Sequence, residues 1–407
     1  MTSRFNPSRR TVLAMGGAGA VALASRAWAQ SKDPIKIGIA TDLTGIAAAY
    51  ANSQINGLRQ AIDEINAAGG LLGREVALVV RDSQAKPDLG VSHARDLITS
   101  EKVSLLIGPV SSGVALGISN LAKQNKVPVI MTAPNTPRLA MELFHPYFFS
   151  VVPSGLMESR AIAAAIGKKA RSFGFIGADY EASHQGLAYF KPWLKKVNPD
   201  AEVTVESFPK LGEPDHTSYI TQLMSARPEV VFSYLWGADL VGFVKQAKPY
   251  GFFDRTIFAS MFFFDDLRAL GADMPDGIVG QMRAPFFALE GARMEEFTKN
   301  YRAKFNEYPA DWAIMSYEAM QIFALASTKA GTVDSDPVVG AIEAIQYDGL
   351  RGQISFRKED HQANVPSFIG TSVPDPAYPF KVFGSMSRIP AEEIWPSIEE
   401  VEASRRA

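Results

Sequence analysis

The sequence predicts an α/β protein made of two lobes, each built on a parallel sheet with helices on both faces. From residue 35 onward, short apolar runs alternate with amphipathic stretches of helical length, a pattern typical of parallel strands joined by crossover helices. A second series of the same kind begins after residues 151–154. The length of 407 residues also favours two domains over one.

The first series predicts the first lobe. Its opening strand covers residues 35–40 and its first helix residues 51–68. Four apolar residues of that helix recur at three- and four-residue spacing and so share one face: Ile55, Leu58, Ile62 and Ile65. The elements expected next are strand 75–80, helix 89–101, strand 103–108, helix 111–125 and strand 127–131.

The second series predicts the second lobe. Its expected helices cover residues 156–168, 183–196, 215–226 and 239–250. Its expected strands cover residues 173–178, 202–208, 229–234 and 256–260. Helices 291–307 and 312–330 follow, and the chain then reads as irregular up to a C-terminal tail at 396–407.

Residues 1–29 have the features of an export signal. They contain four arginines and no acidic residue, then a weakly apolar run at 11–24, then Ala27-Trp28-Ala29, which is the order of a cleavable signal peptide. Residues 8–13, with Arg9 and Arg10, resemble the twin-arginine export motif. The apolar run is too short to span a bilayer, so we expect an exported, soluble protein without stable membrane insertion.

Charge and cysteine content narrow the class of partner. Residues 1–29 hold four of the 41 basic residues and none of the 43 acidic ones, so the remainder carries a net charge of −6. Such a surface gives no electrostatic reason to bind nucleic acid or anionic lipid. The chain has no cysteine, so the fold has no disulfides. A periplasmic protein fits these observations.

The turn GPVSSG at 108–113 lies between a predicted strand and a predicted helix, where open parallel sheets bind ligands. It lacks the Gly-Lys-Ser/Thr of a phosphate loop and the glycine spacing of a dinucleotide site. The hydroxyls of Ser111 and Ser112 and the free N–H groups of a helix start suit a monoanion such as a carboxylate. A simple serine N-cap is the alternative.

Catalytic and metal-binding patterns are missing from the sequence. The five histidines are scattered, and neither H-E-x-x-H nor G-x-S-x-G occurs. We therefore expect no enzyme activity, no metal and no cofactor. An α/β dehydrogenase would need a cofactor fingerprint that the sequence does not contain.

The order and spacing of several segments resemble the type I periplasmic binding proteins of ABC transporters, in particular the branched-chain amino acid binding group. The segments that carry the resemblance are AYANSQINGLRQAIDEINAAGGLLG (49–73), RDSQAKPD (81–88), LIGPVSSG (106–113), VPVIMTAPNTP (127–137), KQAKPYGF (245–252), MSYEAMQIFALASTKAG (315–331) and GQISFRKEDH (352–361). The resemblance covers nearly all of the chain after the signal.

The resemblance implies two Rossmann-like lobes joined by a three-crossing hinge. Lobe 1 would comprise residues 34–152 plus 283–362, and lobe 2 residues 153–282 plus 363–395. The lobes would close on a small-molecule ligand, and the closed form would be presented to the membrane permease of an ABC transporter. A ligand-sensing receptor subunit on the same fold is the alternative.

The resemblance also implies a set of ligand contacts. Tyr50 would cover one side of the ligand, and Ser112, with the backbone of Val110, would hold its carboxylate. The remaining candidates are Ser111, Pro134, Asn135, Thr136, Asp179, Ser183, Trp236 and Phe262.

Two departures from the family pattern concern the ligand. Ser183-His184 replaces the usual Tyr-Gly, so an aromatic contact is expected to be lost. Phe262 stands at or beside the position of the glutamate that receives the ligand ammonium, unless Asp179, Asp239 or Asp265 replaces it. An unpaired buried ammonium costs several kcal/mol. We therefore expect a small carboxylate with an apolar or aromatic body. A branched-chain amino acid and a cationic ligand are the alternatives.

Overall fold

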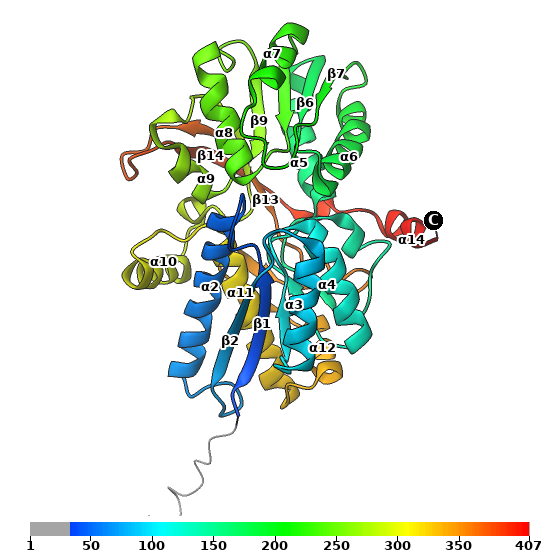
Figure 1. Ribbon diagram of the computed structural model, residues 1–407, viewed down its shortest axis with the longest axis vertical. Helices are drawn as coiled ribbons and strands as arrows, with labels where there is room; N and C mark the ends of the chain where they lie inside the picture. Colours follow the sequence, from blue (N-terminus) through cyan, green and yellow to red (C-terminus); the bar gives the residue numbers. More distant parts are fainter. Residues whose placement is uncertain (1–32, 407) are drawn as a thin grey trace, which may run out of the picture.

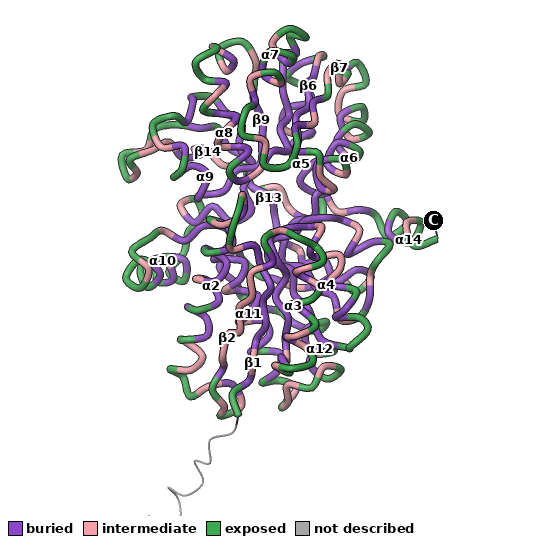
Figure 2. Tube along the Cα trace, viewed as in Figure 1, coloured by how far each residue is buried: buried purple, intermediate pink, exposed green. Residues whose placement is uncertain are grey.

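A computed structural model describes residues 33–406 and has two α/β lobes stacked along the long axis of the molecule (Figure 1). The expected export signal lies outside the described residues. Lobe 1 contains a five-stranded sheet in the order β2-β1-β3-β4-β5, and all of its strand pairs are parallel. The central strands of both sheets lie in the buried interior, whereas the outer helix faces are exposed (Figure 2).

Lobe 1 begins with the alternating strands and helices that the apolar pattern predicts. The first and last residues of these elements differ from the predicted ones by a few positions. The elements are β1 (Ile35–Thr41), α2 (Ala48–Ala67), β2 (Val76–Asp82), α3 (Pro87–Thr99), β3 (Leu105–Ile107), α4 (Ser112–Asn125), β4 (Val129–Met131) and β5 (Phe148–Ser150). The sequence pattern did not predict β5, a three-residue strand directly before the first crossing.

Lobe 2 contains a seven-stranded sheet in the order β14-β13-β10-β9-β8-β6-β7. Its elements up to the return crossing are α5 (Gly155–Ile166), β6 (Ser172–Ile176), α6 (Glu181–Val197), β7 (Glu202–Ser207), α7 (Thr217–Ala226), β8 (Val230–Ser233), α8 (Gly237–Ala247), β9 (Ile257–Met261), α9 (Phe264–Leu270) and β10 (Val279–Met282). The sheet is mixed, because β13 (Ser367–Val373) pairs antiparallel with both β10 and β14 (Val382–Ile389).

Three segments connect the lobes, and two of them run side by side. The backbone N–H of Ser150 donates to His361 O at 3.1 Å, and that of Ala363 donates to Ser150 O at 2.9 Å. The third segment leaves β10 at Met282 and returns the chain to lobe 1. There it forms α10 (Ala292–Phe305), α11 (Asp311–Ala330), α12 (Ser335–Glu343) and the hairpin β11 (Tyr347–Gly349) to β12 (Gly352–Ile354).

The C-terminal region is ordered where the sequence predicted an irregular end. It forms β13, β14, α13 (Ala391–Ile394) and α14 (Ile398–Arg406). Arg405 of α14 donates to the carbonyls of Ala140 and Met141 in lobe 1, each at 3.1 Å. Arg160 of lobe 2 bonds Glu400 at 2.6 Å. These long-range contacts, which no local pattern encodes, hold the expected tail as a helix beside both lobes.

Candidate ligand-binding site

A small cavity of about 40 Å³ lies between the lobes in this closed arrangement. Its walls come from the segments that follow the carboxyl ends of strands in both sheets, as open parallel sheets require. The residues that line it are Tyr50, Val110, Ser112, Ala133, Asn135, Tyr180, Ala182, Tyr234, Trp236, Met261, Phe263, Arg283 and Trp312.

The start of α4 forms one polar end of the cavity. Ser111 has extended backbone angles, and its hydroxyl accepts the N–H of Val114 at 3.4 Å, which is the geometry of an N-cap. The Asp42 carboxylate fixes this turn by accepting the Ser111 N–H at 2.6 Å. Ser112, the first residue of the helix, lines the cavity. The two serines therefore have different positions: one caps the helix and the other faces the site.

Tyr180 reaches this helix start from lobe 2. Its hydroxyl accepts the N–H of Gly113 at 2.8 Å and lies 3.1 Å from the hydroxyl of Ser111. Burial raises the pKa of Tyr180, so its hydroxyl keeps its proton at neutral pH. The closed arrangement thus adds a phenol to the donors at the α4 end. Ser183 does not line the cavity, and Tyr180, three residues earlier in the same loop, supplies an aromatic contact that the sequence comparison did not predict.

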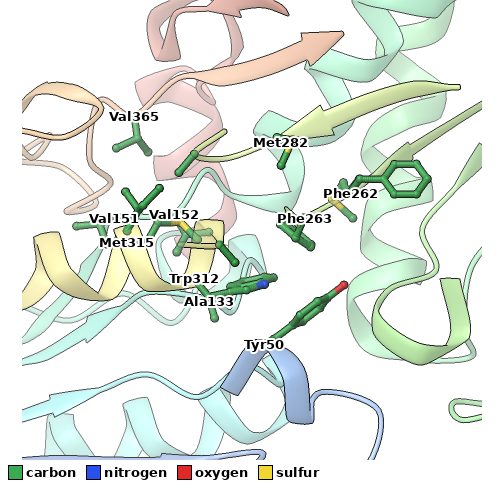
Figure 3. Packing of buried hydrophobic residues seen from close by; sticks show 14 of the residues in the cluster. Tyr50, Ala133, Val151, Val152, Phe262, Phe263, Met282, Trp312, Met315 and Val365 are labelled. Atoms are coloured by element: carbon green, nitrogen blue, oxygen red, sulfur yellow. The ribbon is translucent and has the colours of Figure 1, made fainter. Parts of the chain in front are cut away.

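Aromatic rings form the other walls of the cavity. The ring of Trp312, in the first turn of α11, lies 4.6 Å from that of Tyr50 and 4.2 Å from that of Phe263 (Figure 3). Trp236 lies 5.9 Å from Tyr180. These separations are those of favourable aromatic pairs, so the walls are apolar and pre-formed.

Arg283 is the one lining residue with a charged side chain, among the part of the chain that the structure describes. Its guanidinium donates to both carboxylate oxygens of Glu158, at 2.6 and 3.1 Å, and to the carbonyl of Ala133 at 2.7 Å. Both partners of this ion pair are almost fully buried. The adjacent carboxylate therefore balances the positive charge at this end of the cavity.

The lobes also meet directly beside the cavity. The Tyr50 hydroxyl donates to Asp266 at 2.6 Å and accepts the N–H of Gly237 at 2.8 Å. Ser53 donates to Asp265 at 2.8 Å. Gly237 has a φ of 57°, and an added Cβ would lie 2.4 Å from the carbonyl of Ile46, so this approach requires glycine.

Burial changes the titration of the two aspartates of α9. Desolvation raises the pKa of Asp265 to about 7, and it raises that of Asp266 well above its usual value. A carboxyl group that is buried without a full countercharge favours its neutral form. Both carboxyl groups therefore favour the protonated form more than an exposed aspartate would.

The structure brings together five of the eleven site residues expected from the sequence, and the other six lie outside the cavity lining. Those that line it are Tyr50, Val110, Ser112, Asn135 and Trp236. Those that do not are Ser111, Pro134, Thr136, Asp179, Ser183 and Phe262.

Phe262, which the sequence analysis placed in the ligand site, does not line the cavity. Its ring extends away from the cavity (Figure 3) and packs 5.4 Å from that of Phe383 in lobe 2. Phe263 occupies the expected place, beside Trp312 and Tyr50. Adjacent residues in an extended segment point to opposite sides, so an error of one residue exchanges a wall residue for a core residue.

The three acids considered as ammonium partners bond elsewhere. Asp179 is exposed and lies 2.7 Å from His184. Asp239 accepts the N–H of Gly212 at 2.9 Å. Asp265 bonds Ser53 and lies 3.0 Å from Arg268. None of the three lines the cavity.

Eight lining residues were missed by sequence reasoning: Ala133, Tyr180, Ala182, Tyr234, Met261, Phe263, Arg283 and Trp312. Several stand in the loops that the strand-end rule selected, so the rule located the segments without resolving which side chains face inward. Arg283 directly follows the carboxyl end of β10, a strand end that was not among the searched loops. Trp312 follows no strand and reaches the site because the chain returns to lobe 1 and begins α11 there.

Comparison with known proteins identifies the family. The sequence profile described as "Periplasmic binding protein" matches residues 34–375. The chain belongs to the periplasmic binding protein family. A leucine-, isoleucine-, valine-, threonine- and alanine-binding protein of Pseudomonas aeruginosa is 23% identical, over 83% of this chain and 89% of that protein.

Solved periplasmic binding proteins share the fold at low identity. A solute-binding protein of an ABC transporter from R. palustris, in complex with benzoate, has a TM-score of 0.79 at 19% identity and covers 88% of this chain and 97% of its own. A branched-chain amino acid binding protein from Streptococcus pneumoniae, in complex with isoleucine, has a TM-score of 0.77 at 21% identity and covers 88% of this chain and 100% of its own.

The family to which the chain belongs consists of proteins that bind solutes. This periplasmic binding protein is a solute-binding protein and not an enzyme. Within the described part of the chain, no group of three or more His, Asp or Glu side chains is placed to hold a metal ion. Among residues 33–406, no helix combines the length and hydrophobicity needed to cross a membrane.

Proposed function

We propose that this protein captures a small carboxylate with an aromatic or apolar body and without an ammonium group. It would act in the periplasm, after export by the signal in residues 1–29, as the solute-binding component of an ABC importer. Closure of the lobes would give the membrane permease a shape that differs from the ligand-free form.

The observation that carries the proposal is the charge of the cavity wall. Among the described residues, the lining contains no carboxylate, and its one charged side chain is the cation of Arg283. Glu158 lies behind that cation and is held by it through two hydrogen bonds. A ligand ammonium would therefore lose its water without gaining a carboxylate partner, which costs several kcal/mol.

The start of α4 supports the carboxylate part of the proposal. A carboxylate at this end would be received by Ser112 and by the helix N-terminus, whose dipole favours an anion. Tyr180 already brings a hydroxyl to the same place, 2.8 Å from the N–H of Gly113. Hydrogen bonds to charged groups contribute about 1.5–3 kcal/mol each, so this end can orient the ligand.

The aromatic walls support the ligand body. The rings of Tyr50, Trp312 and Phe263 present flat apolar faces to the cavity. The neighbour solved with benzoate shows that the fold can carry an aromatic acid, and the neighbour solved with isoleucine shows that it can carry an amino acid. Among the described residues, no Asp or Glu side chain lines the cavity, which favours an aromatic acid over an amino acid as the ligand.

A thermal-shift screen of the purified protein tests the proposal. The panel pairs benzoate, phenylacetate and 3-phenylpropanoate with leucine, isoleucine and valine. We expect the melting temperature to rise with at least one of the aromatic acids, since a ligand that binds only the folded state stabilises it. Stabilisation by the three amino acids and by none of the aromatic acids would reject the proposal.

A further inference from the structure

The indole N–H of Trp312 is a buried hydrogen-bond donor without a partner. The side chain is 3% exposed, and Nε1 finds no acceptor among residues 33–406. Buried indole N–H groups normally have a partner, and leaving one unpaired costs about 1–3 kcal/mol. An unpaired donor at this position needs an explanation.

The donor belongs to the cavity wall. Trp312 lines the cavity, and Figure 3 shows its nitrogen on the edge of the ring turned toward Tyr50. The guanidinium carbon of Arg283 lies 5.1 Å from the Trp312 ring. The Trp312 ring is thus part of the cavity wall, and its N–H is shielded from solvent in this closed arrangement.

The acceptors around Trp312 are already engaged by other donors. Asp311 accepts the backbone N–H groups of Phe264, Arg283 and Ala284, at 3.3, 3.0 and 2.7 Å. The Tyr50 hydroxyl bonds Asp266 and Gly237, as described above. These bonds fix the neighbouring oxygens in place, so the protein leaves the Trp312 donor to be satisfied from the cavity.

We infer that Trp312 is a specificity-determining residue, and that it selects ligands whose body carries an oxygen acceptor in addition to the carboxylate. This inference rests on the proposed function, because it assumes that the carboxylate binds at the start of α4. The second oxygen accepts the Trp312 N–H and can approach the guanidinium of Arg283. Glu158 balances the charge of that guanidinium, so a neutral hydroxyl or keto oxygen fits this end better than a second carboxylate.

Calorimetric titration with benzoate and its three monohydroxy isomers tests the inference. In the wild type, we expect at least one isomer to bind about tenfold more tightly than benzoate, as one buried hydrogen bond of about 1.4 kcal/mol requires. In Trp312→Phe, we expect this ratio to fall to about one, whatever happens to benzoate itself. The ratio of the two affinities is the readout, because loss of the larger ring alone would weaken the binding of all four ligands to a similar extent.

Trp395→Phe is the matched control. Trp395 also has an unpaired indole N–H, but it lies outside the cavity, 4.9 Å from the guanidinium of Arg357. This variant should keep the wild-type ratio. A Trp312→Phe protein that keeps the ratio, or a wild type that binds all four acids equally, would overturn the inference while leaving the proposed function intact. Failure of all four acids to bind would overturn the inference, and the proposed function would fall with it only if phenylacetate and 3-phenylpropanoate also failed to stabilise the protein.

A second measurement, on the wild-type protein, tests the inference if the Trp312→Phe variant does not fold. In ¹H–¹⁵N spectra of the wild type, a new hydrogen bond should move the Trp312 indole proton downfield with the preferred isomer and less with benzoate. Equal shifts with both ligands would contradict a direct bond from Trp312.

Discussion

Two adjacent serines at the start of α4 allow binding and stability to be separated. Ser112 lines the cavity, whereas Ser111 caps the helix through the N–H of Val114. We expect Ser112→Ala to weaken binding of a stabilising carboxylate by about 1–3 kcal/mol with little change in melting temperature. Ser111→Ala, the matched variant, should instead lower stability by about 1 kcal/mol.

Calorimetry and thermal melts of the two variants check this division. Unchanged affinity in Ser112→Ala would remove this hydroxyl from the ligand site. The serines also show what the sequence could provide at the scale of single residues. The turn and its anion-binding chemistry were predictable, but the capping role of Ser111 and the cavity position of Ser112 follow from the direction of each side chain.

The short helix α9 places two buried aspartates at the contact between the lobes. Asp265 faces Ser53 and Arg268, and burial raises its pKa to about 7. The other ionisable groups around it are Asp266, Tyr301, Glu307 and Asp311. A raised carboxyl pKa stabilises the folded state fully below the unfolded value, near 3.9, and this stabilisation is lost as pH rises toward 7.

We therefore expect Asp265 to lower the free energy of unfolding by up to about 1.4 kcal/mol for each pH unit between 4 and 7. Asp265→Asn should remove this part of the pH dependence. The parts of the pH dependence that come from Asp239, Asp266 and Asp311 should remain. Chemical denaturation of both proteins at several pH values measures the difference. The same slope in both proteins would contradict a buried, titrating Asp265.

Elements with strong local patterns were predictable, and elements formed by long-range contacts were not. The apolar stripe of α2 and the alternating strands of both lobes could be read from the sequence. In contrast, α9 begins at the third of three consecutive phenylalanines, and its buried Asp265 and Asp266 accept hydrogen bonds from Ser53 and Tyr50 of the other lobe. The C-terminal α14 is likewise held by distant parts of the chain: its Arg405 donates to the carbonyls of Ala140 and Met141, and its Glu400 bonds Arg160.

At the scale of the whole molecule, the site exists because three segments cross between the lobes. The crossings bring Tyr180 and Trp236 of lobe 2 against Tyr50 and Trp312 of lobe 1. The family resemblance predicted this architecture. It did not predict Arg283 in the cavity or Phe263 in place of Phe262, because both depend on side-chain directions at the segment ends.

The proposed site accepts the carboxylate end of an amino acid and rejects its ammonium. Calorimetric titration with two matched pairs tests this most directly: 4-methylpentanoate against leucine, and 3-phenylpropanoate against phenylalanine. Within each pair the ligands differ only in the ammonium group. We expect the acid without the ammonium to bind at least about tenfold more tightly in one pair or both. Tighter binding of leucine and phenylalanine than of their deaminated partners would contradict the account.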